Sequence, residues 1–166
     1  MVLYIGVIGD ARCDEKTYCL AETVGREIAR AGAVLVCGGR GGVMEAASKG
    51  AHTKGGLVLG ILPGPSRAEG NCYLTVAVPT GMGEARNALV ARASDVLIAI
   101  GGGYGTLSEI ALGLKMGRPV VGLGTWRLEK PGMPGPHLLV SETPENAVHL
   151  ALQLGRQGQG GTNLGS

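Results

Sequence analysis

The chain has 166 residues, of which 31 are glycine, and its net charge is +2. Glycine is well above its usual share of about 7% but follows no three-residue period, which excludes a collagen-like chain. An apolar fraction of 45% excludes a disordered chain, and the basic residues form no run, so no nucleic-acid partner is expected.

The apolar runs are too short for a membrane span, and the N-terminus lacks the pattern of a secretory signal. The four cysteines form no C-x-x-C pair, and the three histidines lie far apart in the sequence. We therefore expect neither a disulfide framework nor a metal site. These features predict a cytoplasmic protein with reduced thiols, no cofactor and no membrane partner.

Apolar runs alternate with segments of helical periodicity along most of the chain. Runs rich in Val, Ile and Leu predict strands at Leu3–Gly9, Ala33–Cys37, Leu57–Leu62, Leu74–Val78, Asp95–Ile100 and Val120–Leu123. Apolar residues at helical spacing predict helices at Lys16–Ala31, Val43–Gly55, Gly83–Ala93 and Leu107–Leu114, and from Thr143 onward. The proline-rich segment 124–142 predicts a loop.

Short strands that are apolar on both faces are typical of a parallel sheet covered on two sides. With right-handed crossovers, this order predicts an α/β fold, a Rossmann-like doubly wound parallel sheet of about six strands with helices on both faces. We expect one nucleotide- or phosphate-binding domain over residues 1–154 and a flexible tail over 155–166. Ligands of such folds bind at the carboxyl ends of the strands, near the switch point.

Two glycine-rich loops follow predicted strands at that edge, one over 38–42 and one over 101–106. Glycine lets backbone N–H groups approach a ligand, and the following helix N-terminus favours an anion. The alternative is that these glycines only make tight turns. The triphosphate and dinucleotide signatures are absent, so a monophosphate is the best fit. The candidate ligand-binding residues are Gly38, Gly39, Gly41, Gly42, Gly102, Gly103, Gly105 and Thr106.

A cation and a carboxylate are expected near the second loop. Arg86 lies in the first turn of the preceding predicted helix, and Glu109 lies three residues beyond Thr106. Both side chains could face one phosphate-sized site at this edge of the sheet. The alternatives are a solvated arginine and, for Glu109, a capping box with Thr106.

The segment Gly101–Glu109 resembles the P-G-G-x-G-T-x-x-E motif of the LOG family. Its members are cytokinin riboside 5′-monophosphate phosphoribohydrolases, often misannotated as lysine decarboxylases. Arg86 lies 15 residues before Gly101 (101 − 86), which is the family's spacing for the arginine of an M-x-x-R-K segment. Arg92 and Asp95 match the family pattern as well.

The chain departs from this motif at three positions. Gly101 stands in place of proline, Asn87 in place of the lysine after the arginine, and Ser108 in place of the first of two glutamates. The segments 38–63 and 81–87 instead resemble the molybdenum cofactor carrier proteins. Those proteins share the fold and bind the cofactor without turning it over.

The LOG resemblance implies hydrolysis of the N-glycosidic bond of a nucleoside 5′-monophosphate to a free base and ribose 5-phosphate. Glu109 would then be the catalytic carboxylate, and Arg86 would position the substrate or neutralise its phosphate. The carrier resemblance implies the alternative, a non-catalytic binding protein for the molybdopterin cofactor or a related phosphate-bearing ligand. Both families form homo-oligomers, so a homodimer or a higher homo-oligomer is implied.

Overall fold

The computed structural model of the protein describes residues 1–133 and 138–160. Within these residues, seven strands form one parallel sheet in the order β4-β3-β2-β1-β5-β6-β7. The strands are β1 (Tyr4–Gly9), β2 (Val34–Cys37), β3 (Val58–Leu62), β4 (Val76–Pro79), β5 (Val96–Ile100), β6 (Val120–Leu123) and β7 (Leu139–Ser141).

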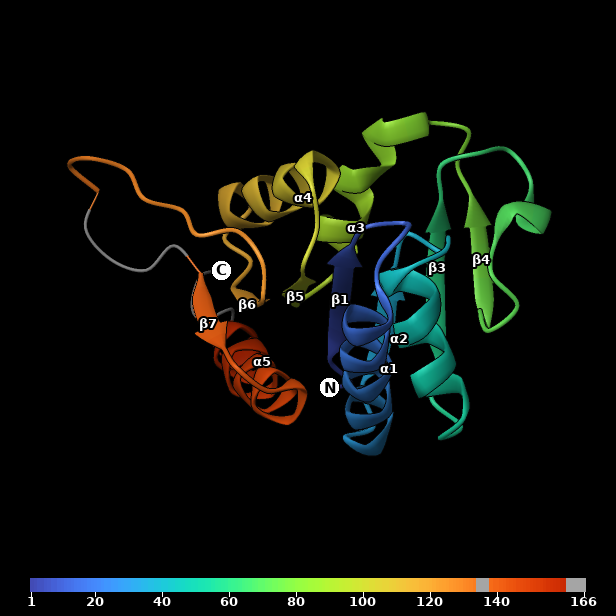
Figure 1. Ribbon diagram of the computed structural model, residues 1–166, viewed down its shortest axis with the longest axis horizontal. Helices are drawn as coiled ribbons and strands as arrows, with labels where there is room; N and C mark the ends of the chain where they lie inside the picture. The colour runs from blue at the N-terminus through green and yellow to red at the C-terminus, as the bar shows by residue number, and fades with distance from the viewer. Residues whose placement is uncertain (134–137, 161–166) are drawn as a thin grey trace, which may run out of the picture.

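Helices cover both faces of the sheet (Figure 1). One face packs against α1 (Glu15–Arg30), α2 (Val43–His52) and α5 (Pro144–Gly160), and the other against α3 (Asn87–Ala93) and α4 (Tyr104–Lys115). Two short 3-10 helices, η1 (Arg67–Glu69) and η2 (Gly83–Arg86), lie before β4 and α3. The predicted doubly wound α/β arrangement is therefore confirmed.

The strands are apolar on both sides because each side meets a different helical layer. In β1, Ile5 and Val7 pack into the core beneath α1, α2 and α5, whereas Ile8 packs into the core beneath α3 and α4. In β5, Ile98 belongs to the first core and Leu97 to the second. Such two-sided burial is the physical reason for the continuous apolar runs seen in the sequence.

The predicted sheet was one strand short. The additional strand, β7, lies in the segment 124–142 that was predicted as a loop; it has three residues, and Val140 in its middle is exposed. A strand of this length shows no periodicity from which it could be recognised. Helix α5 also continues to Gly160, past the expected domain end at residue 154, and residues 161–166 of the predicted tail lie outside the described residues.

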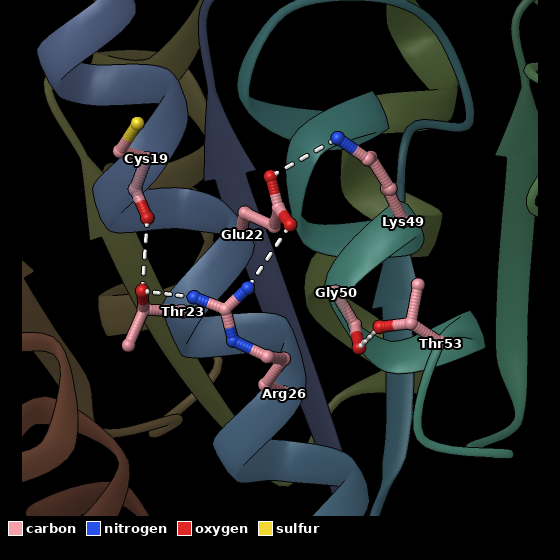
Figure 2. Close-up of polar contacts among 7 residues, drawn as sticks. All are labelled: Cys19, Glu22, Thr23, Arg26, Lys49, Gly50 and Thr53. Carbon is pink, nitrogen blue, oxygen red and sulfur yellow. Dashed lines mark hydrogen bonds and ion pairs between the residues drawn. The ribbon is translucent and has the colours of Figure 1, made fainter.

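Helices α1 and α2 pack closely because glycine stands at their contact. A Cβ atom at Gly25 would lie 1.9 Å from a backbone oxygen of α2, and one at Gly50 would lie 1.9 Å from the carbonyl oxygen of Glu22. The Glu22 carboxylate accepts hydrogen bonds from Arg26 (3.0 Å) within α1 and from Lys49 (3.3 Å) in α2. Figure 2 shows this network at the helix pair.

Within residues 1–133 and 138–160, none of the helices combines the length and the hydrophobicity that a membrane span requires.

Substitution of Gly25 by alanine should destabilise the protein. The new methyl group would meet backbone atoms of α2, which cannot rotate away, so the helices must separate at a cost of about 1–3 kcal/mol. Gly158→Ala is the matched control, because no atom lies within 4 Å of the place that its new methyl group would take and alanine favours a helix. Urea unfolding measures both, and equal midpoints for the two variants would contradict the close packing.

Candidate functional site

The site lies at the switch point of the sheet, where strands that follow one another in the sequence stop adding to one side of β1 and begin to add to the other. Strand β1 is central, between β2 and β5, so β2–β4 extend to one side and β5–β7 to the other. A pocket of about 230 Å³ opens at the carboxyl ends of these strands, as expected for a switch-point crevice. Its lining residues are Gly9, Asp10, Ala11, Arg40, Met44, Pro63, Glu84, Arg86, Asn87, Gly105, Thr106 and Glu109.

Arg86 ends η2 and is buried, with 7% of its surface exposed. Its Nε and Nη1 atoms are buried and have no hydrogen-bond partner among the described residues. Burial lowers the pKa of this guanidinium, and the nearby Glu109 carboxylate partly offsets that shift. A buried cation with unused donors is costly unless an anion pairs with it, so Arg86 indicates an anionic ligand.

Glu109 lies in the second turn of α4 and is also 7% exposed. Burial raises the pKa of its carboxyl group from 4.5 to about 7, although the positive charge of Arg86 lowers it. The two side chains form no direct ion pair within the described part of the chain. A carboxyl group with a pKa near neutrality, beside a cation in a pocket, is typical of acid–base chemistry.

Thr106 contributes a second unused polar group. Its hydroxyl is buried and has no hydrogen-bond partner among residues 1–133 and 138–160. Helix α4 begins at Tyr104 with Gly103 as its N-cap, so Thr106 lies inside the helix. The alternative interpretation of Thr106 and Glu109 as a capping box is therefore wrong, because that motif requires the hydroxyl residue to precede the helix.

The first glycine loop makes room for Arg86. A Cβ atom at Gly38 would lie 2.0 Å from Nη1 of Arg86. At Gly42, where φ is +60°, it would lie 2.3 Å from the carbonyl oxygen of Asp10, and that oxygen already accepts the N–H of Val43 at 3.0 Å. The pocket is lined by Arg40 and Met44 rather than by Gly38, Gly39, Gly41 or Gly42, whose contact with a ligand stays a prediction.

The second glycine loop reaches the pocket at its end. Gly105 and Thr106 line the pocket, whereas Gly102 and Gly103 do not. At Gly102, φ is +98° and a Cβ atom would lie 2.3 Å from the Thr106 hydroxyl oxygen, so this glycine leaves the space that the hydroxyl occupies. The N–H of Gly103 is already used, because it donates to Oδ1 of Asp10 at 2.9 Å.

Two of the departures from the LOG motif contact each other. The Asn87 amide donates to the Ser108 hydroxyl at 3.3 Å, and this hydroxyl donates to the Gly105 carbonyl at 2.7 Å. A neutral hydrogen bond thus joins η2–α3 to α4 beside the pocket, at the positions where the motif has a lysine and a glutamate.

Sequence analysis missed several lining residues, of which Asp10 is the most prominent. The available signal was an acidic residue directly after the central strand, at the edge where ligands bind. Glu84 and Met44 carried no comparable signal. Among the described residues, no group of three or more His, Cys, Asp or Glu side chains is arranged to hold a metal ion.

Comparison with known proteins relates most of the chain to one family. The model of the SLOG cluster4 family matches residues 2–152. An uncharacterized protein of Archaeoglobus fulgidus is 48% identical over 153 residues, which are 91% of this chain and 95% of that protein. The rice (Oryza sativa subsp. japonica) cytokinin riboside 5′-monophosphate phosphoribohydrolase LOG is 38% identical over 94 residues, 54% of this chain and 38% of that protein.

Among solved structures, the molybdenum cofactor binding protein from the phototrophic bacterium Rippkaea orientalis is similar to this chain. It has 36% sequence identity and a TM-score of 0.85, over 93% of this chain and 98% of that protein. Both resemblances that the sequence predicted are thus confirmed. The LOG similarity is limited to part of the chain, whereas the carrier-like similarity extends over nearly all of it.

The ionisation of Glu109 should make stability depend on pH. The raised pKa means that the folded chain holds a proton which the unfolded chain releases, so this contribution to stability is complete below pH 4.5 and is lost as pH rises through about 7. Glu109→Gln cannot ionise. When the pH is raised from 4.5 to 8, the free energy of unfolding of this variant should therefore increase by up to about 3 kcal/mol relative to that of the wild type.

Urea unfolding at both pH values measures this difference, and titrations common to the two proteins cancel in it. Glu129→Gln is the charge-matched control, because Glu129 is exposed. A stability difference between Glu109→Gln and the wild type that does not change with pH would contradict the buried ionisation.

Proposed function

Because this chain belongs to the SLOG cluster4 family, we propose that it binds a nucleoside 5′-monophosphate-like ligand and hydrolyses its N-glycosidic bond. The products are a free base and ribose 5-phosphate. The observation that carries the proposal is the buried Arg86 guanidinium, with two unused donors, beside the buried Glu109 carboxyl group in one pocket. One residue supplies charge for a phosphate, and the other supplies a carboxylate for the bond that breaks.

The phosphate binds to donors that the protein leaves unused. These are Nε and Nη1 of Arg86 and the Thr106 hydroxyl. A guanidinium favours phosphate oxygens because its hydrogen bonds to them are charge-assisted. The pocket volume of about 230 Å³ is below the range of about 300–1,000 Å³ for whole small-molecule ligands. It therefore suits the phosphosugar, and the base extends beyond it.

Hydrolysis requires a carboxylate close to the anomeric carbon. In its ionised form Glu109 stabilises the positive charge that develops on the sugar as the C1′–N bond breaks. It also accepts a proton from the water whose oxygen forms the new bond to C1′. The base leaves with the electron pair of the broken bond and takes up a proton. Arg86 holds the phosphate, which fixes the sugar in the orientation needed for attack.

The alternative is a non-catalytic carrier of the molybdopterin cofactor or a related phosphate-bearing ligand. Two observations favour it. The similarity to the Rippkaea orientalis protein covers 93% of this chain, and the Asn87–Ser108 hydrogen bond stands where the LOG motif has two charged residues. In a carrier, Arg86 and Thr106 would hold the ligand phosphate, and Glu109 would have no chemical role.

A base-release assay distinguishes the two functions. The purified protein is incubated with a panel of nucleoside 5′-monophosphates, and the free base is measured by chromatography. We expect release from at least one of them, and a decrease in kcat of about 10²–10⁴-fold in Glu109→Gln. The kcat/KM of the wild type should rise with pH and level off above about 7, because the ionised carboxyl group is the active form.

Glu129→Gln is again the control, and its rate should equal that of the wild type. Base release that persists in Glu109→Gln would refute the role of this carboxylate. No release from any nucleotide, together with a pterin that copurifies with the protein and is detected by mass spectrometry, would establish the carrier function instead.

The homodimer or higher homo-oligomer implied by the family resemblance, and the cytoplasmic location, are also proposals. Multi-angle light scattering on the purified full chain should give at least twice the mass of one chain. A mass equal to that of one chain across the micromolar range would refute the oligomer.

A further inference from the structure

Asp10 links the two glycine loops. It directly follows β1, lines the pocket and is exposed there. Its carbonyl oxygen accepts the N–H of Val43 at 3.0 Å, where the first loop enters α2. Its Oδ1 atom accepts the N–H of Gly103 at 2.9 Å, at the N-cap of α4. One residue therefore satisfies a donor from each loop.

The second loop makes a further side-chain contact, with Trp126. The carbonyl oxygen of Gly103 accepts the indole N–H of Trp126 at 3.1 Å. The same peptide region is thus fixed by Asp10 at its N–H and by Trp126 at its carbonyl. A change at Asp10 should therefore be transmitted to the indole, which is the only tryptophan in the sequence.

The Asp10 carboxylate also decides which ligand group can bind beside it. A helix N-terminus attracts anions, but at the N-terminus of α4 the N–H of Gly103 already donates a hydrogen bond to this carboxylate. A ligand phosphate placed there would meet a like charge, whereas Arg86 and Thr106 offer unused donors deeper in the pocket. The phosphate and Asp10 are therefore assigned to different parts of the site.

An ionised carboxylate only accepts hydrogen bonds. Within the described residues, the Gly103 N–H is the one hydrogen bond that this carboxylate makes, so Oδ2 is free for a donor on the ligand. In a phosphosugar, the donors away from the phosphate are the hydroxyl groups. A site built to bond a hydroxyl group also rejects ligands that lack it.

We propose that Asp10 is a specificity-determining residue, which accepts a hydrogen bond from a sugar hydroxyl of the ligand while it holds the second glycine loop against the first. This inference rests on the proposed binding of a phosphosugar. It gives Asp10 no part in bond breaking, and it distinguishes a sugar phosphate from a phosphate that lacks hydroxyl groups.

The test titrates ribose 5-phosphate and inorganic phosphate into the full-length wild type, Asp10→Asn and Asp10→Ala, with Trp126 emission and calorimetry as readouts. The preference for ribose 5-phosphate is the Kd of inorganic phosphate divided by the Kd of ribose 5-phosphate. We expect this ratio to fall about ten- to hundredfold in both variants. Affinity for inorganic phosphate should stay the same or increase, because a negative charge is removed. The Glu27→Gln variant, altered near the end of α1 away from the pocket, should behave as the wild type.

The ligand-free proteins test the loop contact separately. The Asn side chain can still accept the Gly103 N–H through its amide oxygen, so Trp126 emission should match the wild type in Asp10→Asn and shift in Asp10→Ala. An unchanged ratio of Kd values in Asp10→Asn would overturn the hydroxyl contact, and unshifted emission in folded Asp10→Ala would overturn the loop contact. A wild type that binds neither compound would instead refute the proposed function.

Discussion

The site depends on how closely two loops approach the backbone that follows the central strand. At Gly9, a Cβ atom would lie 2.6 Å from a side-chain carbon of Val43 and 2.7 Å from the carbonyl oxygen of Ile100. At Gly42 it would lie 2.3 Å from the carbonyl oxygen of Asp10. These distances are too short for real contacts, so a side chain at either position would push the loops apart. Glycine therefore sets the width of the crevice between the two halves of the sheet.

Within this crevice the protein buries polar groups that it does not satisfy itself. Each buried donor without a partner costs about 1–3 kcal/mol, against a total stability of about 5–15 kcal/mol for a typical domain. Arg86 alone has two such donors, and Thr106 adds a hydroxyl. A protein can keep such unpaired polar groups in its interior when a ligand forms hydrogen bonds with them. The same groups therefore destabilise the empty protein and prepare it for an anion.

Local patterns in the sequence were sufficient to predict the layers of the fold and the elements that carry Arg86 and Glu109. The structure places both side chains in one pocket because parallel strands bring the following helix starts to one edge. The reasons for individual glycines could not be predicted, since they depend on contacts between distant segments. Gly38 lies against Arg86, and Gly25 lies against α2; neither partner can be inferred from a single sequence.

The sequence left open whether the protein hydrolyses its ligand or only binds it. The environment of Glu109 in the structure is relevant to this choice. A carrier must release its ligand unchanged, so it has no need of a carboxyl group that ionises near neutral pH. An ionised carboxyl group is more stable in water than in a protein interior. Glu109 is nevertheless buried beside Arg86, and its pKa is about 7. Removal of its charge would relieve that cost without loss of the Arg86 and Thr106 donors for a phosphate. The two proposed functions therefore differ at one residue, because the hydrolase requires the ionised Glu109 carboxylate and the carrier does not, even though the overall fold is common to both.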